Sequence, residues 1–195
     1  MKSISGTSRI VILVSALIMI ATYFVPLWQI LMWAPQYPEW LTMKIWINDI
    51  SGDVKIINAL NHYIGMKLIE LDMFPEFSYM IYLLAGLIGI GVLAGIIGKR
   101  FAVWIYLFSL ATAGVAALVD FYLWGYDYGH NLNPEAAIQV PGMTYQPPLI
   151  GTKQLLNFTA YSGPDIGGWI FVISGLMVIG VIVYELKFRK GEPGI

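Results

Sequence analysis

The chain of 195 residues contains no cysteine, which excludes disulfides, thiolate metal sites, a thiol nucleophile and a lipidated cysteine anchor. Charge is also scarce, because Asp, Glu, Lys and Arg make up 12% of the residues, against about 25% in a typical soluble domain. Hydrophobic residues make up 58%, and the mean hydropathy is +0.71. This composition predicts an integral membrane protein. The net charge of −1 gives no reason to expect a nucleic-acid partner.

Four stretches without any charged residue are long enough to cross the hydrocarbon core of a bilayer as helices. They lie near residues 10–32, 77–98, 101–119 and 166–184. We therefore expect an all-α fold, a four-transmembrane-helix bundle that forms a single membrane domain over 1–195. Two long loops, 33–76 and 120–165, would connect the spans outside the membrane.

Small residues on the second and third spans predict that these two helices pack closely. Gly91 and Gly95 form a G-x-x-x-G step, and Ala113 with Ala117 gives the third span a small-residue face. Lys99 and Arg100 form a tight turn between the two spans. We expect an antiparallel hairpin.

The orientation follows from the distribution of charge. The head, the middle turn and the tail, which includes Arg189 and Lys190, hold seven of the eleven basic residues and two of the twelve acids. The two long loops hold four basic residues and nine acids, with Asp120 as a further acid at the edge of the second loop. The positive-inside rule then places both termini in the cytoplasm and both long loops outside. For a bacterial chain this means a multi-pass protein of the inner membrane with periplasmic loops.

The first loop contains two elements. Alternation through Leu41, Met43, Ile45 and Ile47 predicts a short strand or extended piece. The following segment, 51–76, predicts an amphipathic interfacial helix that lies on the membrane. Its apolar stripe consists of Ile57, Leu60, Ile64, Leu68 and Leu71. The second loop is rich in Gly, Pro and Asn, and we expect it to be mostly irregular.

Histidine and methionine in the loops are the candidate metal ligands. On a helix over 51–76, His62, Met66 and Met73 share the face opposite the apolar stripe, and the second loop could add His130 and Met143. Imidazole and thioether together suit a soft ion, so Cu(I) is the candidate cofactor. The alternative is that the histidines are polar interface residues and the methionines flexible apolar filler.

Catalysis has the weakest support. Asp127 and His130 lie three residues apart, but no nucleophile, phosphate loop or pair of carboxylates accompanies them. We therefore expect no catalytic residue and no enzyme. A b-type haem is disfavoured because no histidine lies within a predicted span.

Three segments carry a resemblance to a known family: PLWQILMWAPQYPEWLTMKIWIND at 26–49, INALNHYIGMK at 57–67 and VPGMTYQPPLIGTKQLLNFTAYSGPDIGGW at 140–169. They resemble a family of small four-span membrane proteins of Bacteroidetes-type bacteria, associated with the copper-handling accessory set of nitrous-oxide reductase. The resemblance implies an outer-side role in copper supply, assembly or electron delivery. It also implies that His62 and Met66 are the leading residues.

Two functions from different classes therefore stay open. The first is a metal-handling accessory protein that binds Cu(I) transiently on its outer face. The second is a structural or scaffold subunit whose outer loops dock a periplasmic or membrane partner, since G-x-x-x-G faces and aromatic loops serve interaction directly. Membrane lipid is an expected partner under both, and a homo-oligomer is compatible with both.

Overall fold

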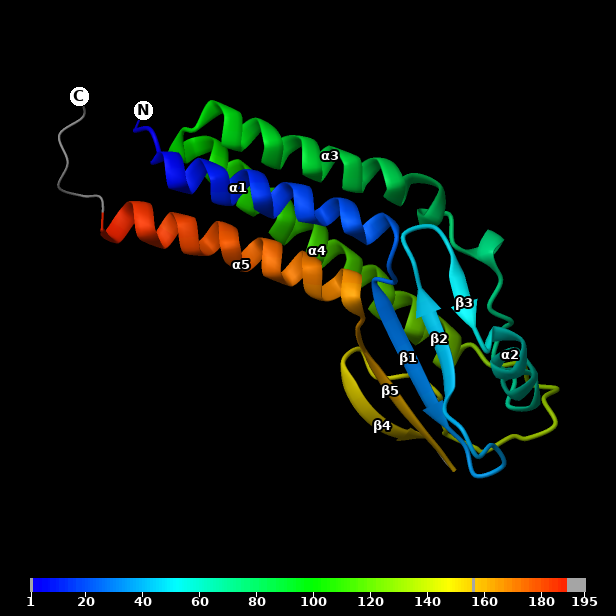
Figure 1. The fold of residues 1–195 in the computed structure, drawn as a ribbon. Coiled ribbons are helices and arrows are strands. Elements are labelled where there is room, and N and C mark those ends of the chain that lie inside the picture. The colour runs from blue at the N-terminus through cyan, green and yellow to red at the C-terminus, as the bar shows by residue number, and fades with distance from the viewer. Residues whose placement is uncertain (1, 156, 189–195) are drawn as a thin grey trace.

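The computed structural model describes residues 2–155 and 157–188, and it combines long helices with a sheet. Four helices, α1, α3, α4 and α5, run side by side, and a five-stranded antiparallel sheet with the short helix α2 lies at one end of them (Figure 1). The expected all-α fold is therefore wrong, and the chain has a mixed α/β fold. Arg189 and Lys190 of the predicted basic tail lie outside the described residues.

The helices account for all four predicted spans, with shifted ends. They are α1 (Gly6–Ile18), continued by the 3₁₀ helix η1 (Met19–Tyr23), α2 (Val54–Tyr63), the 3₁₀ helix η2 (Leu71–Met73), α3 (Glu76–Ile97), α4 (Arg100–His130) and α5 (Ile166–Lys187). In the described part of the chain, four helical stretches are long and apolar enough to cross a membrane. They are Gly6–Tyr23, Met80–Ile97, Arg100–His130 and Ile166–Lys187.

The first span ends well before the predicted boundary at residue 32. Helical backbone stops at Tyr23, and Pro26 then removes a backbone donor that a continuing helix would need. Residues 28–33 instead form a strand. The sequence did not reveal this change, because apart from Gln29 the side chains of residues 28–33 are apolar on both sides of the strand and show no clear alternation.

The sheet has the strand order β3-β2-β1-β5-β4, with every neighbouring pair antiparallel. Its strands are β1 (Trp28–Trp33), β2 (Leu41–Ile45), β3 (Ile50–Gly52), β4 (Gly151–Leu155) and β5 (Phe158–Pro164). The predicted strand near 41–47 is thus confirmed as β2. The second loop, expected to be mostly irregular, supplies two further strands.

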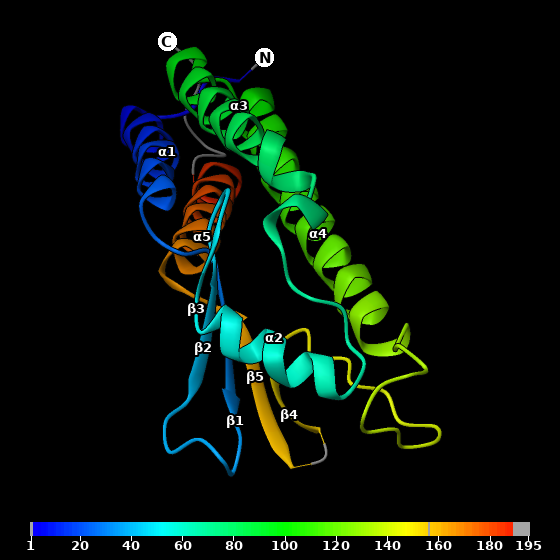
Figure 2. The ribbon, with the colours of Figure 1, turned by 90° about the vertical axis from the view of Figure 1, so that its right-hand side faces the viewer.

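One face of the sheet is covered. Ile30, Met43 and Ala160 point to this face and are buried, and helix α2 packs across it. Figure 2 shows α2 lying across the sheet while the last part of α4 runs past the end of α3 beside it. At 1.5 Å per residue the 31 residues of α4 extend about 46 Å, more than a hydrocarbon core of about 30 Å needs.

The central strands are continuous with the bundle. Strand β1 follows α1 and η1, strand β5 leads directly into α5, and the two strands are paired from Trp28↔Pro164 to Trp33↔Thr159. At the junction the amide of Gly167 donates to the carbonyl of Pro26 at 2.8 Å. A Cβ at Gly168 would lie 2.4 Å from the carbonyl oxygen of Leu27, so the two chain segments touch backbone to backbone. The sheet is therefore fixed to the bundle.

The glycine face of α3 contacts α1 as well as α4. A Cβ at Gly91 would lie 2.7 Å from Ala16 of α1 and 2.6 Å from the Tyr106 ring of α4. A Cβ at Gly95 would lie 2.6 Å from Leu13 of α1. The G-x-x-x-G step therefore packs against α1. Ala117, part of the small-residue face predicted for α4, is exposed. The predicted α3–α4 hairpin forms, but its closest glycine contacts involve a third helix.

Buried hydroxyl groups inside the bundle form hydrogen bonds with neighbouring helices. The Ser174 hydroxyl donates to the backbone carbonyl of Ser15 at 2.7 Å and lies 3.2 Å from the Tyr106 hydroxyl. Ser15, Tyr106 and Ser174 are fully buried. These contacts connect α1, α4 and α5 where the surroundings offer no water.

The helix expected over 51–76 is shorter than predicted. It begins after Asp53 and ends at Tyr63, and Gly65 then adopts a left-handed backbone with φ +80°. Ile57 and Ile64 of the predicted stripe are buried, the first of them in the core beneath the sheet, whereas Leu68 and Leu71 lie beyond the helix and are exposed. The helix therefore packs its buried side against the sheet, where the sequence had predicted a side buried in the membrane surface.

Candidate functional site

Three of the predicted metal ligands come from the first loop, and they do not share one helix face. His62 is exposed in the last turn of α2, whereas Met66 follows the helix and is half-buried against the core beneath the sheet. Met73 lies in η2, where its sulfur lies 3.5 Å from the Tyr128 hydroxyl, which donates to it. The one-turn spacing of His62 and Met66 is lost because the helix ends at Tyr63.

The other two predicted ligands come from the second loop. His130 ends α4, its ring stacks on Tyr126 with centroids 3.9 Å apart, and its Nδ1 lies 2.9 Å from the Tyr126 carbonyl oxygen. Met143 is half-buried in the following loop. Within residues 2–155 and 157–188, no hydrogen bond or ring contact joins two of the five predicted ligands, and no three His, Cys, Asp or Glu residues gather in a group suited to a metal ion.

The two loops do meet, as the metal hypothesis required. The amide of Asn133 donates to the Gly65 carbonyl at 2.8 Å, and the amide of Ile138 donates to the Tyr63 carbonyl at 2.9 Å. Lys67 and Asp127 add an exposed ion pair of 2.6 Å, which holds the pKa of the Asp127 carboxyl below its usual value. The second loop therefore lies against the end of α2, although the ligands themselves stay apart.

An aromatic cluster fills the space between α4 and the sheet. Trp124 lies 4.7 Å from Tyr128 and 5.6 Å from Phe121 between ring centroids, and Phe121 lies 5.6 Å from Trp28 of β1. The Tyr128 hydroxyl donates to the Leu68 carbonyl at 2.8 Å, and burial raises the pKa of this hydroxyl above its usual value. These rings pack helix α4 against the sheet.

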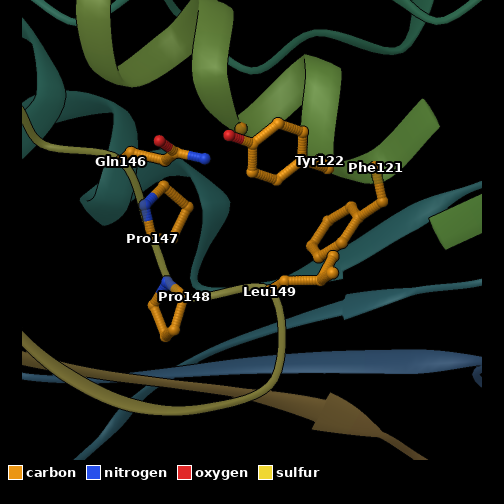
Figure 3. Close-up of a pocket in the computed structure, with 7 residues that line it drawn as sticks. Phe121, Tyr122, Gln146, Pro147, Pro148 and Leu149 are labelled. Carbon is orange, nitrogen blue, oxygen red and sulfur yellow. The ribbon is translucent and has the colours of Figure 1, made fainter. Parts of the chain in front are cut away.

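A small notch opens beside this cluster. It is lined by Phe121, Tyr122, Gly125 and the segment 146–149, and it has room for little more than a water molecule. Figure 3 shows Gln146 and Pro147 facing the Tyr122 ring, with Leu149 against Phe121. A notch of this size is far below the several hundred Å³ of typical small-molecule sites. It offers no basis for a substrate pocket.

The second face of the sheet is the larger feature. Among residues 2–155 and 157–188 no helix lies over this face, which is turned to the viewer in Figure 1. We call it the open face and define it by the side chains that alternate with the buried ones: Gln29, Leu31, Trp33, Thr42, Lys44, Ser51, Thr152, Gln154, Thr159 and Tyr161. Trp33 is 42% exposed, which is high for so large an aromatic side chain in a strand.

The open face is nearly free of net charge. Its one charged residue, Lys44, pairs with Asp165 at 3.4 Å at the junction with α5. The remaining members are aromatic, aliphatic, amide or hydroxyl side chains. Tryptophan and tyrosine with few charges are typical of the centre of protein–protein interfaces. Cationic surfaces that bind nucleic acid have the opposite composition.

Sequence reasoning missed this face. The signal that could have found it is the alternation in 151–164, where Leu155, Ala160 and Ser162 point to one side and Thr152, Thr159 and Tyr161 to the other. No protein-family model matches the chain, and no match is found among curated proteins or solved structures. The site is therefore argued from its own geometry.

Proposed function

We propose that this protein is a membrane-anchored accessory subunit that uses the open face of its sheet to dock a partner protein at the outer surface of the membrane. The observation that carries the proposal is the contrast between the two faces of one sheet. One face is packed by α2 and α4, whereas the other carries an exposed Trp33 and half-buried Leu31 and Tyr161.

Membrane anchoring is supported by the outward surfaces of the four long helices. Large aliphatic and aromatic side chains cover these surfaces, with exposures from 49% to 63%: Ile10, Leu83, Leu93, Ile105, Phe108, Val115, Leu176 and Val183. A soluble bundle would place polar residues there. We therefore propose that the bundle lies in the bilayer, with both termini on the cytoplasmic side and the sheet in the periplasm, as the charge distribution predicts.

A rigid attachment suits a docking role. Because β1 continues α1 and β5 continues into α5, a partner bound to the central strands is held at a fixed height above the membrane. The occupant that fits is a protein surface of matching neutral and aromatic character, either a soluble periplasmic protein or the outer part of another membrane protein.

A photo-reactive phenylalanine analogue placed singly in the full-length protein in its own membrane tests the proposal. Analogues at Gln29 and Thr159 of the open face are expected to give one cross-linked product of the same mass. The control position, Ala59, is exposed on α2 and is expected to give none. Introducing Leu31→Asp should abolish the product while leaving the melting temperature nearly unchanged. Equal cross-linking from Ala59, or a product insensitive to Leu31→Asp, would contradict the proposal.

Copper handling stays a prediction of the sequence. Purified protein titrated with Cu(I) would bind about one ion per chain if the predicted ligands act together, and His62→Ala would weaken binding more than Met73→Ala. Wild type and His62→Ala with the same weak affinity would end the metal hypothesis.

A further inference from the structure

The end of the bundle opposite the sheet contains a buried acid that the sequence gave no reason to single out. Glu185, near the end of α5, is 1% exposed. Its Oε1 accepts from the amide of Ser5 at 2.7 Å and from the Ser8 hydroxyl at 2.7 Å, and its Oε2 lies 3.6 Å from an Arg100 amino group. The Glu185 charge is thus neutralised within the protein. We call this end of the bundle the basic end.

The N-terminal segment brings further cations to the same place. Ser3 forms an isolated bridge with Lys99, and the amide of Arg100 donates to the carbonyl of Lys2 at 3.2 Å. Lys2 and Lys99 therefore flank Arg100, and both are exposed. Arg9 and Lys187 are exposed at this end as well, and within 2–12, 92–108 and 178–188 Glu185 is the only acid. With Glu185 neutralised by Arg100, the basic end carries a net positive charge.

A small surface depression, which we call the groove, lies beside this cationic rim between α4 and α5 and is no roomier than the notch described above. Its apolar walls are Ile4, Val103, Trp104, Val181, Ile182 and Leu186, and Arg100 and Glu185 line its polar end. Trp104 is 38% exposed, in the position of an interfacial aromatic ring. The Nε of Arg100 is buried and has no hydrogen-bond partner within the described residues. A buried donor of this kind is costly unless a ligand satisfies it.

We propose that the groove and its rim form a binding site for one anionic phospholipid. The phosphate would lie at Arg100 between Lys2 and Lys99, and one acyl chain would lie against the exposed side chains of Trp104 and Leu186. The cations match the charge of the headgroup, and the apolar walls match the chain. The inference rests on the membrane anchoring proposed above, and it is independent of docking on the open face.

The test uses the full chain purified in a neutral detergent, with phosphatidylglycerol or phosphatidylcholine of identical acyl chains added. Native mass spectrometry should show one phosphatidylglycerol retained per chain, at least about fivefold more than phosphatidylcholine, as about 1 kcal/mol per basic side chain near the headgroup gives. Melting temperature should rise with phosphatidylglycerol only. Soluble glycerol phosphate should give no such rise, because it lacks the acyl chain.

Variants locate the site. Lys2→Gln combined with Lys99→Gln should lower phosphatidylglycerol retention at least fivefold, and these exposed side chains make no contact on which folding depends. Arg100→Lys keeps a cation beside Glu185 but removes the Nε donor, and it should also lower retention. Lys55→Gln on α2 is the matched control and should change nothing. Equal retention of the two lipids, retention unaffected by the double variant, or full protection by glycerol phosphate alone would overturn the proposal.

Discussion

The bundle and the sheet are stabilised in different ways. Inside the bundle the helices approach through glycine and alanine around an apolar core, buried hydroxyls bond to carbonyls of neighbouring helices, and further apolar side chains cover the outer surface. The sheet domain has a core of aliphatic and aromatic side chains on one face, and its other face mixes hydroxyl and amide side chains with Leu31, Trp33 and Tyr161. This difference in outer surface is what supports the proposal that the bundle lies in lipid and the sheet outside it.

The largest expected loss of stability comes from removing Glu185, which binds Ser5, Ser8 and Arg100 inside the bundle. Glu185→Ala removes the partner of a partly buried arginine and the acceptor for Ser5 and Ser8, and it should cost about 3–5 kcal/mol of unfolding free energy. Val183→Ala, on the outward face of the same helix, should cost much less. Thermal unfolding of both variants in one detergent measures the difference. Equal losses of unfolding free energy in the two variants would mean that the hydrogen bonds and ion pair of Glu185 add no stability of their own.

The next effect compares the two faces of the sheet at adjacent residues of β1. Ile30→Ala empties a site that is 3% exposed and should cost about 3 kcal/mol. Leu31→Ala, on the open face, should cost under about 1 kcal/mol, because surface substitutions are mostly small in effect. Denaturant titration of each variant provides the test. A larger loss for Leu31→Ala would show that the open face is covered within the protein itself.

A smaller effect is expected from two glycines of α3. Gly91→Leu drives a side chain into Tyr106 and Ala16 and should cost about 1–3 kcal/mol through overpacking. Gly89→Leu meets open space, because no atom lies within 4 Å of its Cβ position, and should leave the melting temperature unchanged or higher. If the two variants had the same melting temperature, α3 would have to pack through a different face.

The four long apolar helices could be predicted from the sequence, whereas most of the sheet could not. Uncharged runs of about 20 residues identify a helix by length and hydropathy alone, so the error there was confined to the ends. Strand β2 was found because Leu41, Met43 and Ile45 alternate with polar neighbours. Strand β1 was hidden inside an apolar run, and β5 contains glycine and proline, which indicate a loop when pairing is unknown.

The predicted metal ligands were also misplaced because the sequence does not show which distant segments come into contact. His62 and Met66 were placed on one helix face by counting residues, but Gly65 and the contact of Asn133 with it end the helix first. Such a stop depends on a partner segment about 70 residues away and cannot be seen locally. Glu185 was missed for a related reason. It follows an apolar span as a single acid and becomes notable only when Ser5 and Arg100 are brought to it.

The most direct test of the central claim is the accessibility of single cysteines, which the absence of native cysteine makes unambiguous. Lys55→Cys and Lys153→Cys lie in the sheet domain, and Lys99→Cys lies at the basic end. In intact cells a membrane-impermeant thiol reagent is expected to label the first two, and to label the third only after the cells are opened. Labelling of Lys99→Cys in intact cells, with Lys55→Cys and Lys153→Cys protected, would contradict the proposed placement of the sheet outside the membrane.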